Sequence, residues 1–154
     1  MQERTGSYRQ TGFSLIELLI VVAVIGILAA VAIPNLIGAV QRSRQSRTMA
    51  DMRMIGEGIE LYQKDHSQYP VNASGTVADL ADHLRIYIRS YNTQDGWGTP
   101  LDYESDGLRY TIISYGRDGA IDLPYAYGPT GSYDDDIVFS GGNFLQWPEG
   151  PQDF

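Results

Sequence analysis

The hydrophobic pattern separates an unbroken apolar run near the N-terminus from a patterned stretch that follows it. From Phe13 to Ile33, 21 residues are almost wholly apolar. At about 1.5 Å per residue, a helix of that length reaches roughly 32 Å, close to the thickness of a bilayer's hydrocarbon core. A chain of 154 residues could hardly bury such a helix on all sides. The run therefore predicts a membrane-spanning helix rather than a core helix.

The stretch from residue 35 to about residue 62 is amphipathic. Its apolar positions recur at spacings of three, four and three, which places them on one face of a helix. These positions are Met52, Ile55, Ile59 and Tyr62. We expect this half of the helix to pack against a small globular head.

Together the two stretches predict one long helix from Phe13 to about Lys64. Pro34 lacks an amide hydrogen and clashes with the preceding turn, so we expect a kink there. Residues 66–75, "HSQYPVNASG", read as a break after this helix because they contain proline and glycine.

The second half of the chain predicts short elements. Residues 77–85 favour a short helix, and residues 95–101, "DGWGTPL", favour a turn with an aromatic anchor. The pattern of residues 101–103 and 109–114 is typical of strands, and "ESDG" between them is typical of a hairpin turn. Beyond Tyr115 we expect a loop-rich C-terminus. The predicted fold class is α+β, with the long helix packed on a small antiparallel sheet.

Charge changes this picture in one respect. The formal net charge is -8, and residues 65–154 carry 14 acidic and 4 basic residues. The acidity therefore belongs to the head, and a nucleic-acid partner is disfavoured because it would require a basic face. The chain has no cysteine, which excludes disulfides and thiolate metal sites.

The N-terminal region carries two unusual features. Residues 1–12 are polar and include Arg4 and Arg9, and positive charge before a first span favours a cytoplasmic N-terminus. Glu17 lies inside the apolar run, where a carboxylate is costly and usually has a partner. The run itself contains no basic residue. A free amino terminus at Phe13 would be a suitable partner for the Glu17 carboxylate. Such a terminus exists only if the chain is cleaved after Gly12.

The stretch "TGFSLIELLIVVAVIGILAAVAIP" closely resembles the N-terminal signature of type IV pilins and type II secretion pseudopilins. The matching residues are Gly12 before the cut, Phe13 after it, Glu17, Gly26 and Pro34. The resemblance implies that a prepilin peptidase removes residues 1–12 and methylates the new amine. It also implies that residues 13–34 anchor the protein in the membrane and later form the filament core, below a head of residues 35–154. Glu17 would then pair with the terminal amine of a neighbouring subunit, and the Gly26–Pro34 segment could melt during assembly.

A second signal lies in the acidic loop, which we define as residues 115–136. It gathers Asp118, Asp122, Asp134, Asp135 and Asp136. The order of these residues differs from that of an EF-hand. Calcium favours six to eight oxygen ligands from carboxylates and loop carbonyls. The residues alone leave two readings open: a solvated acidic surface or a calcium site.

The segments "DGWGTPL", "YTIISYGRDG" and "DDI" resemble the C-terminal signature of the major pseudopilin of type II secretion, the G-type subunit. The resemblance implies a calcium ion held by Asp118, Asp135 and Asp136, with the backbone carbonyls of Tyr115 and Ala120. The loop is longer here than in typical members, so Asp122 or Asp134 could substitute. The tail after residue 137 is also longer than usual.

These patterns favour a structural subunit over an enzyme. The two histidines, His66 and His83, stand apart in the sequence, and no nucleophile elbow, phosphate loop or metalloprotease motif occurs. The resemblance implies a major pseudopilin in the inner membrane, with its head in the periplasm. Its implied partners are copies of itself, minor pseudopilins, the prepilin peptidase, the inner-membrane assembly platform and, before assembly, the lipid bilayer. The alternative is a major type IV pilin of a surface fibre, with a role in adhesion, motility or electron transfer.

Overall fold

The structure is a computed structural model that describes residues 12–153. The predicted leader, residues 1–12, therefore lies outside the described residues except for Gly12. The chain divides into two compact units, Met1–Ile37 and Gly38–Phe154. Each unit is described by itself below.

Helix α1 spans Leu15–His66 and contains Pro34. The carbonyl of Ser14 accepts the amide hydrogens of Glu17 and Leu18 at 3.1 and 3.2 Å, which starts the helix. The predicted long helix is therefore confirmed, with each end displaced by about two residues toward the C-terminus. The kink at Pro34 stays a prediction.

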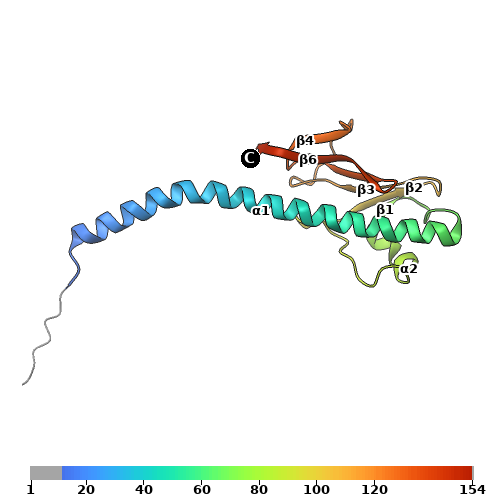
Figure 1. Cartoon of the computed structure of the whole chain (residues 1–154), viewed down its shortest axis with the longest axis horizontal. Helices are drawn as coiled ribbons and strands as arrows, with labels where there is room; N and C mark the ends of the chain where they lie inside the picture. Colours follow the sequence, from blue (N-terminus) through green and yellow to red (C-terminus); the bar gives the residue numbers. More distant parts are fainter. Residues whose placement is uncertain (1–11, 154) are drawn as a thin grey trace, which may run out of the picture. The chain divides into compact units, whose positions relative to one another are not determined.

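The second unit contains a sheet whose six described strands follow the order β1-β2-β3-β5-β6-β4. Each neighbouring pair is antiparallel except β4 with β6, which is parallel. Within this unit, the C-terminal part of α1 lies along one face of the sheet, and the segment that carries α2 lies on the opposite side of that helix (Figure 1). The predicted α+β class is confirmed. The strands are β1 Asn72–Thr76, β2 Asp102–Ser105, β3 Tyr110–Ser114, β4 Gly128–Ser132, β5 Ile137–Ser140 and β6 Asn143–Asp153.

The core of this unit lies between α1 and the sheet. Met52, Ile55 and Ile59 are fully buried, as their spacing predicts, whereas Tyr62 is only half-buried. The helix approaches the sheet so closely at Gly56 that an added Cβ would lie 2.3 Å from a Phe139 ring atom. The face read from the sequence therefore fixes how α1 sits on the sheet. Sheet residues of this core include Tyr103, Tyr110, Ile112, Ile137 and Phe139, and Leu101 joins them from the position just before β2.

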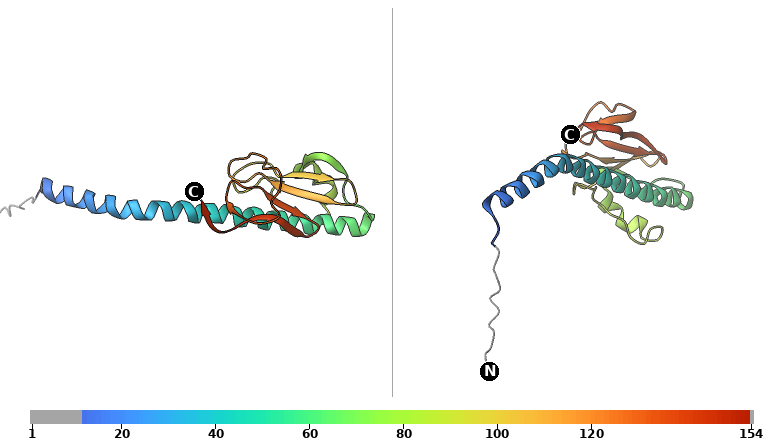
Figure 2. Two further views of the ribbon diagram at one scale, coloured as in Figure 1. Left: turned by 90° about the horizontal axis from the view of Figure 1, so that it is seen from above. Right: turned by 60° about the vertical axis from the view of Figure 1, so that its left-hand side comes forward.

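The short predicted elements have mixed outcomes. The helix predicted over residues 77–85 is a 3₁₀ turn, Val77–Leu80, continued by α2, Ala81–Leu84. Strands β2 and β3 lie within one or two residues of the predicted ones. The sequence did not predict β1, which begins inside the expected break. It also did not predict β4, β5 and β6, which follow the start of the acidic loop. Figure 2 shows these last strands in orange and red, with β6 ending beside β4.

Candidate functional site

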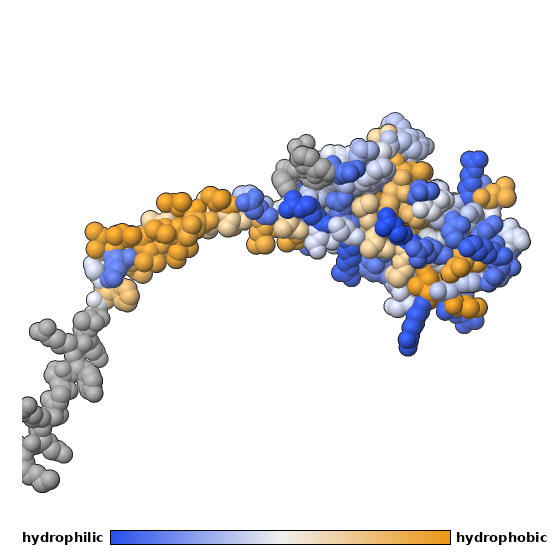
Figure 3. All heavy atoms as spheres, viewed as in Figure 1, coloured by the Kyte–Doolittle hydropathy of each residue, from blue (hydrophilic) through white to orange (hydrophobic). Residues whose placement is uncertain are grey.

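The first candidate site is the apolar half of α1. In the described part of the first unit, residues 12–37, every side chain is exposed except that of Ala29, which is half-buried. Phe13 is 83% exposed. Among the described residues, α1 is the one helix long and apolar enough to cross a membrane. Figure 3 shows this stretch as a continuous apolar surface. The predicted apolar span is therefore present and is uncovered in the single chain.

The residues implied in assembly lie at separate levels of this helix. Glu17 is in the first turn, and Gly26 and Pro34 lie within the helix. Among residues 12–153, the structure shows no ion pair at Glu17. Near Pro34, the Asn35 side chain donates from Nδ2 to the carbonyl of Val31 at 3.2 Å. The roles of Glu17, Gly26 and Pro34 in assembly stay predictions, as does cleavage after Gly12.

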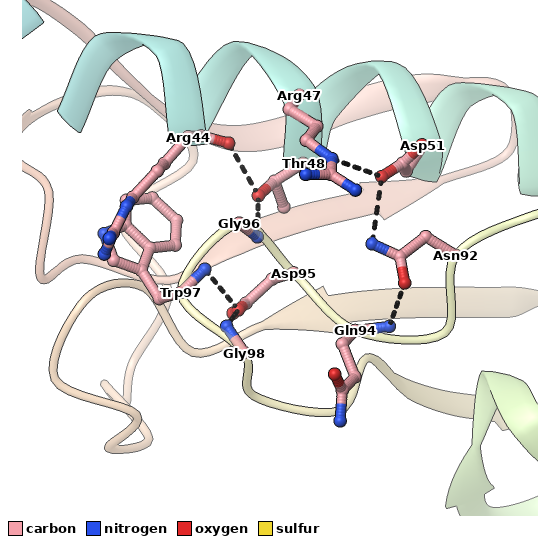
Figure 4. A network of polar contacts seen from close by, with 10 residues as sticks. All are labelled: Arg44, Arg47, Thr48, Asp51, Asn92, Gln94, Asp95, Gly96, Trp97 and Gly98. Carbon is pink, nitrogen blue, oxygen red and sulfur yellow. Dashed lines mark hydrogen bonds and ion pairs between the residues drawn. The ribbon is translucent and has the colours of Figure 1, made fainter. Parts of the chain in front are cut away.

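The turn at residues 95–100 docks on α1 in the second unit (Figure 4). Asp95 is 4% exposed, and its Oδ1 accepts the backbone amides of residues 97, 98 and 99, each at 2.9 Å. Its Oδ2 accepts the Ser114 hydroxyl at 2.8 Å. Trp97 donates from Nε1 to Gln41 Oε1 at 2.7 Å. The predicted turn with an aromatic anchor is confirmed, and Asp95 joins it to the last residue of β3.

Two of the implied loop residues are engaged by neighbouring groups. Arg117 makes a two-pronged contact with Asp134, from Nε to Oδ1 and from an Nη to Oδ2, each at 2.6 Å. This guanidinium lowers the pKa of Asp134 below its usual value. Tyr115 donates its hydroxyl to Asp102. Asp134 is therefore committed to an ion pair in this arrangement.

Asp136 lies at the base of the acidic loop and is fully buried. Its Oδ2 accepts the amide of Asp122 at 3.1 Å, while its Oδ1 has no hydrogen-bond partner within the described residues. Burial, followed by the charges of Asp122, Asp118 and Asp135, raises the pKa of Asp136 to about 6. The negative charges of these three neighbours therefore oppose ionisation of Asp136.

The other acidic residues face local backbone amides. Asp118 accepts the amide of Ala120 at 3.0 Å, and Asp135 accepts that of Ser132 at 3.1 Å. Within the described residues, no three acidic or histidine side chains are gathered closely enough to hold a metal ion. The structure thus brings the predicted carboxylates into one loop without converging their oxygens. The unpartnered oxygen of Asp136 is the feature that fits a cation, since a buried acceptor without a donor is costly.

One residue of this site was missed by the sequence reading. Gln146, on β6, is 3% exposed and bonds the acidic loop at two points. Its Nε2 donates to the Asp136 carbonyl at 2.9 Å, and its Oε1 accepts the amide of Ala126 at 2.6 Å. A single polar residue between Leu145 and Trp147 offered no local signal of this role.

Two sequence comparisons bear on these sites. Residues 7–33 match the family described as the prokaryotic N-terminal methylation motif. Residues 35–124 match the family described as type II secretion system (T2SS), protein G, which is more than half of the chain. The chain belongs to the type II secretion system protein G family.

Relatives named "Type II secretion system core protein G" agree with this membership. The one from Dickeya chrysanthemi is 32% identical over 131 residues, covering 84% of this chain and 85% of that protein. The one from Escherichia coli K12 is 30% identical, covering 84% and 90%, and the one from Vibrio cholerae is 31% identical, covering 72% and 83%. No solved structure matches the chain significantly. The expected resemblance to G-type pseudopilins is confirmed, and it favours the secretion system over the surface fibre.

Proposed function

We propose that this protein G family member is the major pseudopilin of a type II secretion system, the repeating subunit of a periplasmic filament. The observation that carries the proposal is the apolar half of α1, which is exposed along residues 12–37 and carries a single carboxylate, Glu17. An apolar surface of this length needs a cover in water. A bilayer covers it before assembly, and neighbouring helices cover it in a filament.

The processing step follows from the position of Glu17 relative to the predicted cut. Cleavage between Gly12 and Phe13 makes Glu17 the fifth residue and creates a terminal amine at the same end of the helix. A buried carboxylate is stabilised only by a well-placed partner of opposite charge. The amine of a neighbouring copy supplies that charge, so a subunit in the wrong register leaves Glu17 unpaired. The peptidase, which also methylates the amine, is the first partner of the chain.

The membrane topology follows from the positive charge that precedes the span, at Arg4 and Arg9. The N-terminus lies in the cytoplasm, the span crosses the inner membrane, and the head lies in the periplasm. The assembly platform and the minor pseudopilins are the further partners of this subunit.

Mass spectrometry and electron microscopy together test this function. With prepilin peptidase and the secretion machinery co-expressed, the chain is expected to lose residues 1–12, to gain one methyl group, and to form filaments when overproduced. A Gly12→Leu variant, which blocks the cut, is the control and should remain in the membrane unassembled. A wild-type chain that still begins at Met1 in the presence of active peptidase, or that never forms filaments, contradicts the proposal.

We further propose that the acidic loop binds calcium. Asp136 supplies the unpartnered oxygen Oδ1, and Asp118 and Asp135 supply the further carboxylates that the resemblance implies. Asp122 is an alternative ligand, whereas Asp134 would first have to leave Arg117. The carbonyls of Tyr115 and Ala120 are the implied backbone ligands. A bound calcium ion supplies positive charge that offsets the repulsion among these carboxylates.

Thermal unfolding of the full-length protein in detergent tests the calcium site. Calcium at about ten times its Kd should stabilise the head by roughly 1.4 kcal/mol, which corresponds to a few degrees in Tm. Magnesium should do less, because its small octahedral shell fits carbonyl-rich loops poorly. Asp136→Asn should abolish the gain, and Asp82→Asn, at an exposed position on α2, should preserve it. An unchanged Tm with calcium in the wild type rejects the site.

A further inference from the structure

The C-terminal strand β6 bonds the acidic loop through one side chain. Gln146 is buried, and its amide touches two backbone groups that lie ten residues apart in the loop, the carbonyl of Asp136 and the amide of Ala126. Asp136 in turn accepts the amide of Asp122. The segment from residue 122 to residue 126 is therefore tied to the sheet by bonds that pass through Gln146 and Asp136.

The register of the sheet explains why this side chain reaches both groups. Gln146 pairs with Val138 of β5 on one side and with Gly128 of β4 on the other. Asp136 and Ala126 each lie two residues before these partners. The side-chain amide thus adds one bond to each ladder beyond the paired residues. The side chain must donate to one group and accept from the other, which an uncharged amide can do and a carboxylate or an aliphatic chain cannot.

The loop needs such a tie when no cation is present. The carboxylates of Asp118, Asp122 and Asp135 raise the pKa of Asp136 through their charges, so they oppose closure. Among the described residues, Arg117 is the cation that forms an ion pair within the loop, and its partner is Asp134. Several apolar side chains of the loop are exposed and add little to closure, among them Ile121, Leu123 and Tyr127.

Gln146 lies in the C-terminal tail, outside the part of the chain that matches the protein G family. The match to the protein G family ends at residue 124, so β6 lies entirely beyond it. We infer that Gln146 is the positioning residue that keeps the acidic loop closed in the absence of a metal, so that the tail strand presents the loop's carboxylates in a preformed arrangement. This inference deepens the proposed calcium site, but closure without metal can be measured on its own.

Limited proteolysis of the full-length protein in detergent and EGTA tests the inference. Chymotrypsin can cut after Tyr125 and Tyr127, and the rate of cutting follows the population of the open loop. In Gln146→Leu the buried carbonyl of Asp136 and the partly buried amide of Ala126 lose their partner, so cutting at these sites should rise roughly tenfold or more. Gln146→Glu keeps the acceptor but loses the donor, and it should also cut faster. Gln68→Leu, at an exposed position outside the loop, should cut like the wild type.

A calcium titration provides the second readout. A loop that is open most of the time binds more weakly in proportion to its closed fraction. Gln146→Leu should therefore raise the apparent Kd for calcium by the ratio of the closed fraction in the wild type to that in the variant, and saturating calcium should restore protection. If calcium changes nothing while the variants still differ in EGTA, the calcium site fails and the role of Gln146 stands.

Two results overturn the inference. One is wild-type cutting at Tyr125 and Tyr127 in both Gln146 variants. The other is equal acceleration at every site in the head, including sites outside the loop, in the nearly isosteric Gln146→Glu variant. That pattern would mean that Gln146 supports the whole fold rather than the loop.

Discussion

The amide of Gly96 donates a 2.8 Å hydrogen bond to Thr48 Oγ1, and this bond joins the turn at residues 95–100 to helix α1. Thr48 is fully buried and donates in turn to the carbonyl of Arg44 at 3.0 Å. The same turn is joined to β3 by the bond between Ser114 and Asp95. Since β3 leads into the acidic loop, the turn connects the start of that loop to the part of α1 that packs on the sheet.

The first prediction concerns the close approach of Gly96 to the backbone of Arg44. An added Cβ would lie 2.4 Å from the Arg44 carbonyl oxygen, which is backbone and cannot rotate away. Gly96→Ala should therefore lower the free energy of unfolding of the head by about 1–3 kcal/mol, the usual cost of overpacking. Gly131→Ala, where the added Cβ meets nothing within 4 Å, is the matched control. Denaturant unfolding followed by tryptophan fluorescence measures both, and equal stability of the two variants would refute the close contact.

The ion pair between Arg117 and Asp134 makes the second prediction. Both side chains are about one-third exposed, so the pair should contribute only about 0.2–1 kcal/mol. Arg117→Met should increase cutting in the acidic loop a few-fold, and added salt should narrow its difference from the wild type, because salt screens the ion pair that the variant lacks. Asp134→Asn should have the same effect, and the double variant should be no worse than either single one. Additive effects of the two substitutions would show that the residues act separately.

The helical part of this fold could be read from the sequence, whereas much of the sheet could not. Met52, Ile55 and Ile59 lie at helical spacing, and their burial depends only on that local period. Strand β4, "GPTGS", is rich in residues that strands usually avoid, and it is held by parallel pairing with β6. Such pairing is set by distant residues and leaves no local pattern.

The candidate sites divide in the same way. Glu17 could be read because a carboxylate in an apolar run is conspicuous by itself. Asp95 and Gln146 could not, because their partners lie up to 20 residues away and their roles depend on burial. The commitment of Asp134 to Arg117 likewise depends on folding, since the two residues are 17 positions apart.

Glu17 makes the third prediction, which concerns assembly. Glu17→Ala removes a polar cost in the membrane and should insert at least as well as the wild type. It should nonetheless yield few filaments, because the amine of a neighbouring subunit loses its partner. Glu17→Gln keeps nearly the same shape and tests charge against hydrogen bonding. Membrane fractionation and counting of shear-released filaments by electron microscopy measure the two steps, and wild-type filament yield in Glu17→Ala would reject the pairing.

Asp136 makes the last prediction, which concerns pH. Its pKa is raised from 3.8 to about 6 in the folded protein, so the folded state holds its proton more tightly than the unfolded state does. The stability that this carboxyl contributes is therefore fully present below about pH 3.8 and is lost as the pH rises through 6. In EGTA, the acidic loop should be better protected from hydrogen exchange at pH 5 than at pH 7.5.

Asp134 does not offset this change, because its lowered pKa places its own titration below the same window. The control is Asp136→Asn, in which protection should vary much less between pH 5 and 7.5, once intrinsic exchange rates are corrected. Burial also raises the pKa of Asp122, so this carboxyl accounts for the variation that remains. Calcium should reverse the order in the wild type, since it competes with the proton for Asp136 and binds better at pH 7.5. If protection in EGTA instead falls from pH 7.5 to pH 5, the carboxylate of Asp136 is stabilised in its charged form, and the repulsion within the loop is not what opens it.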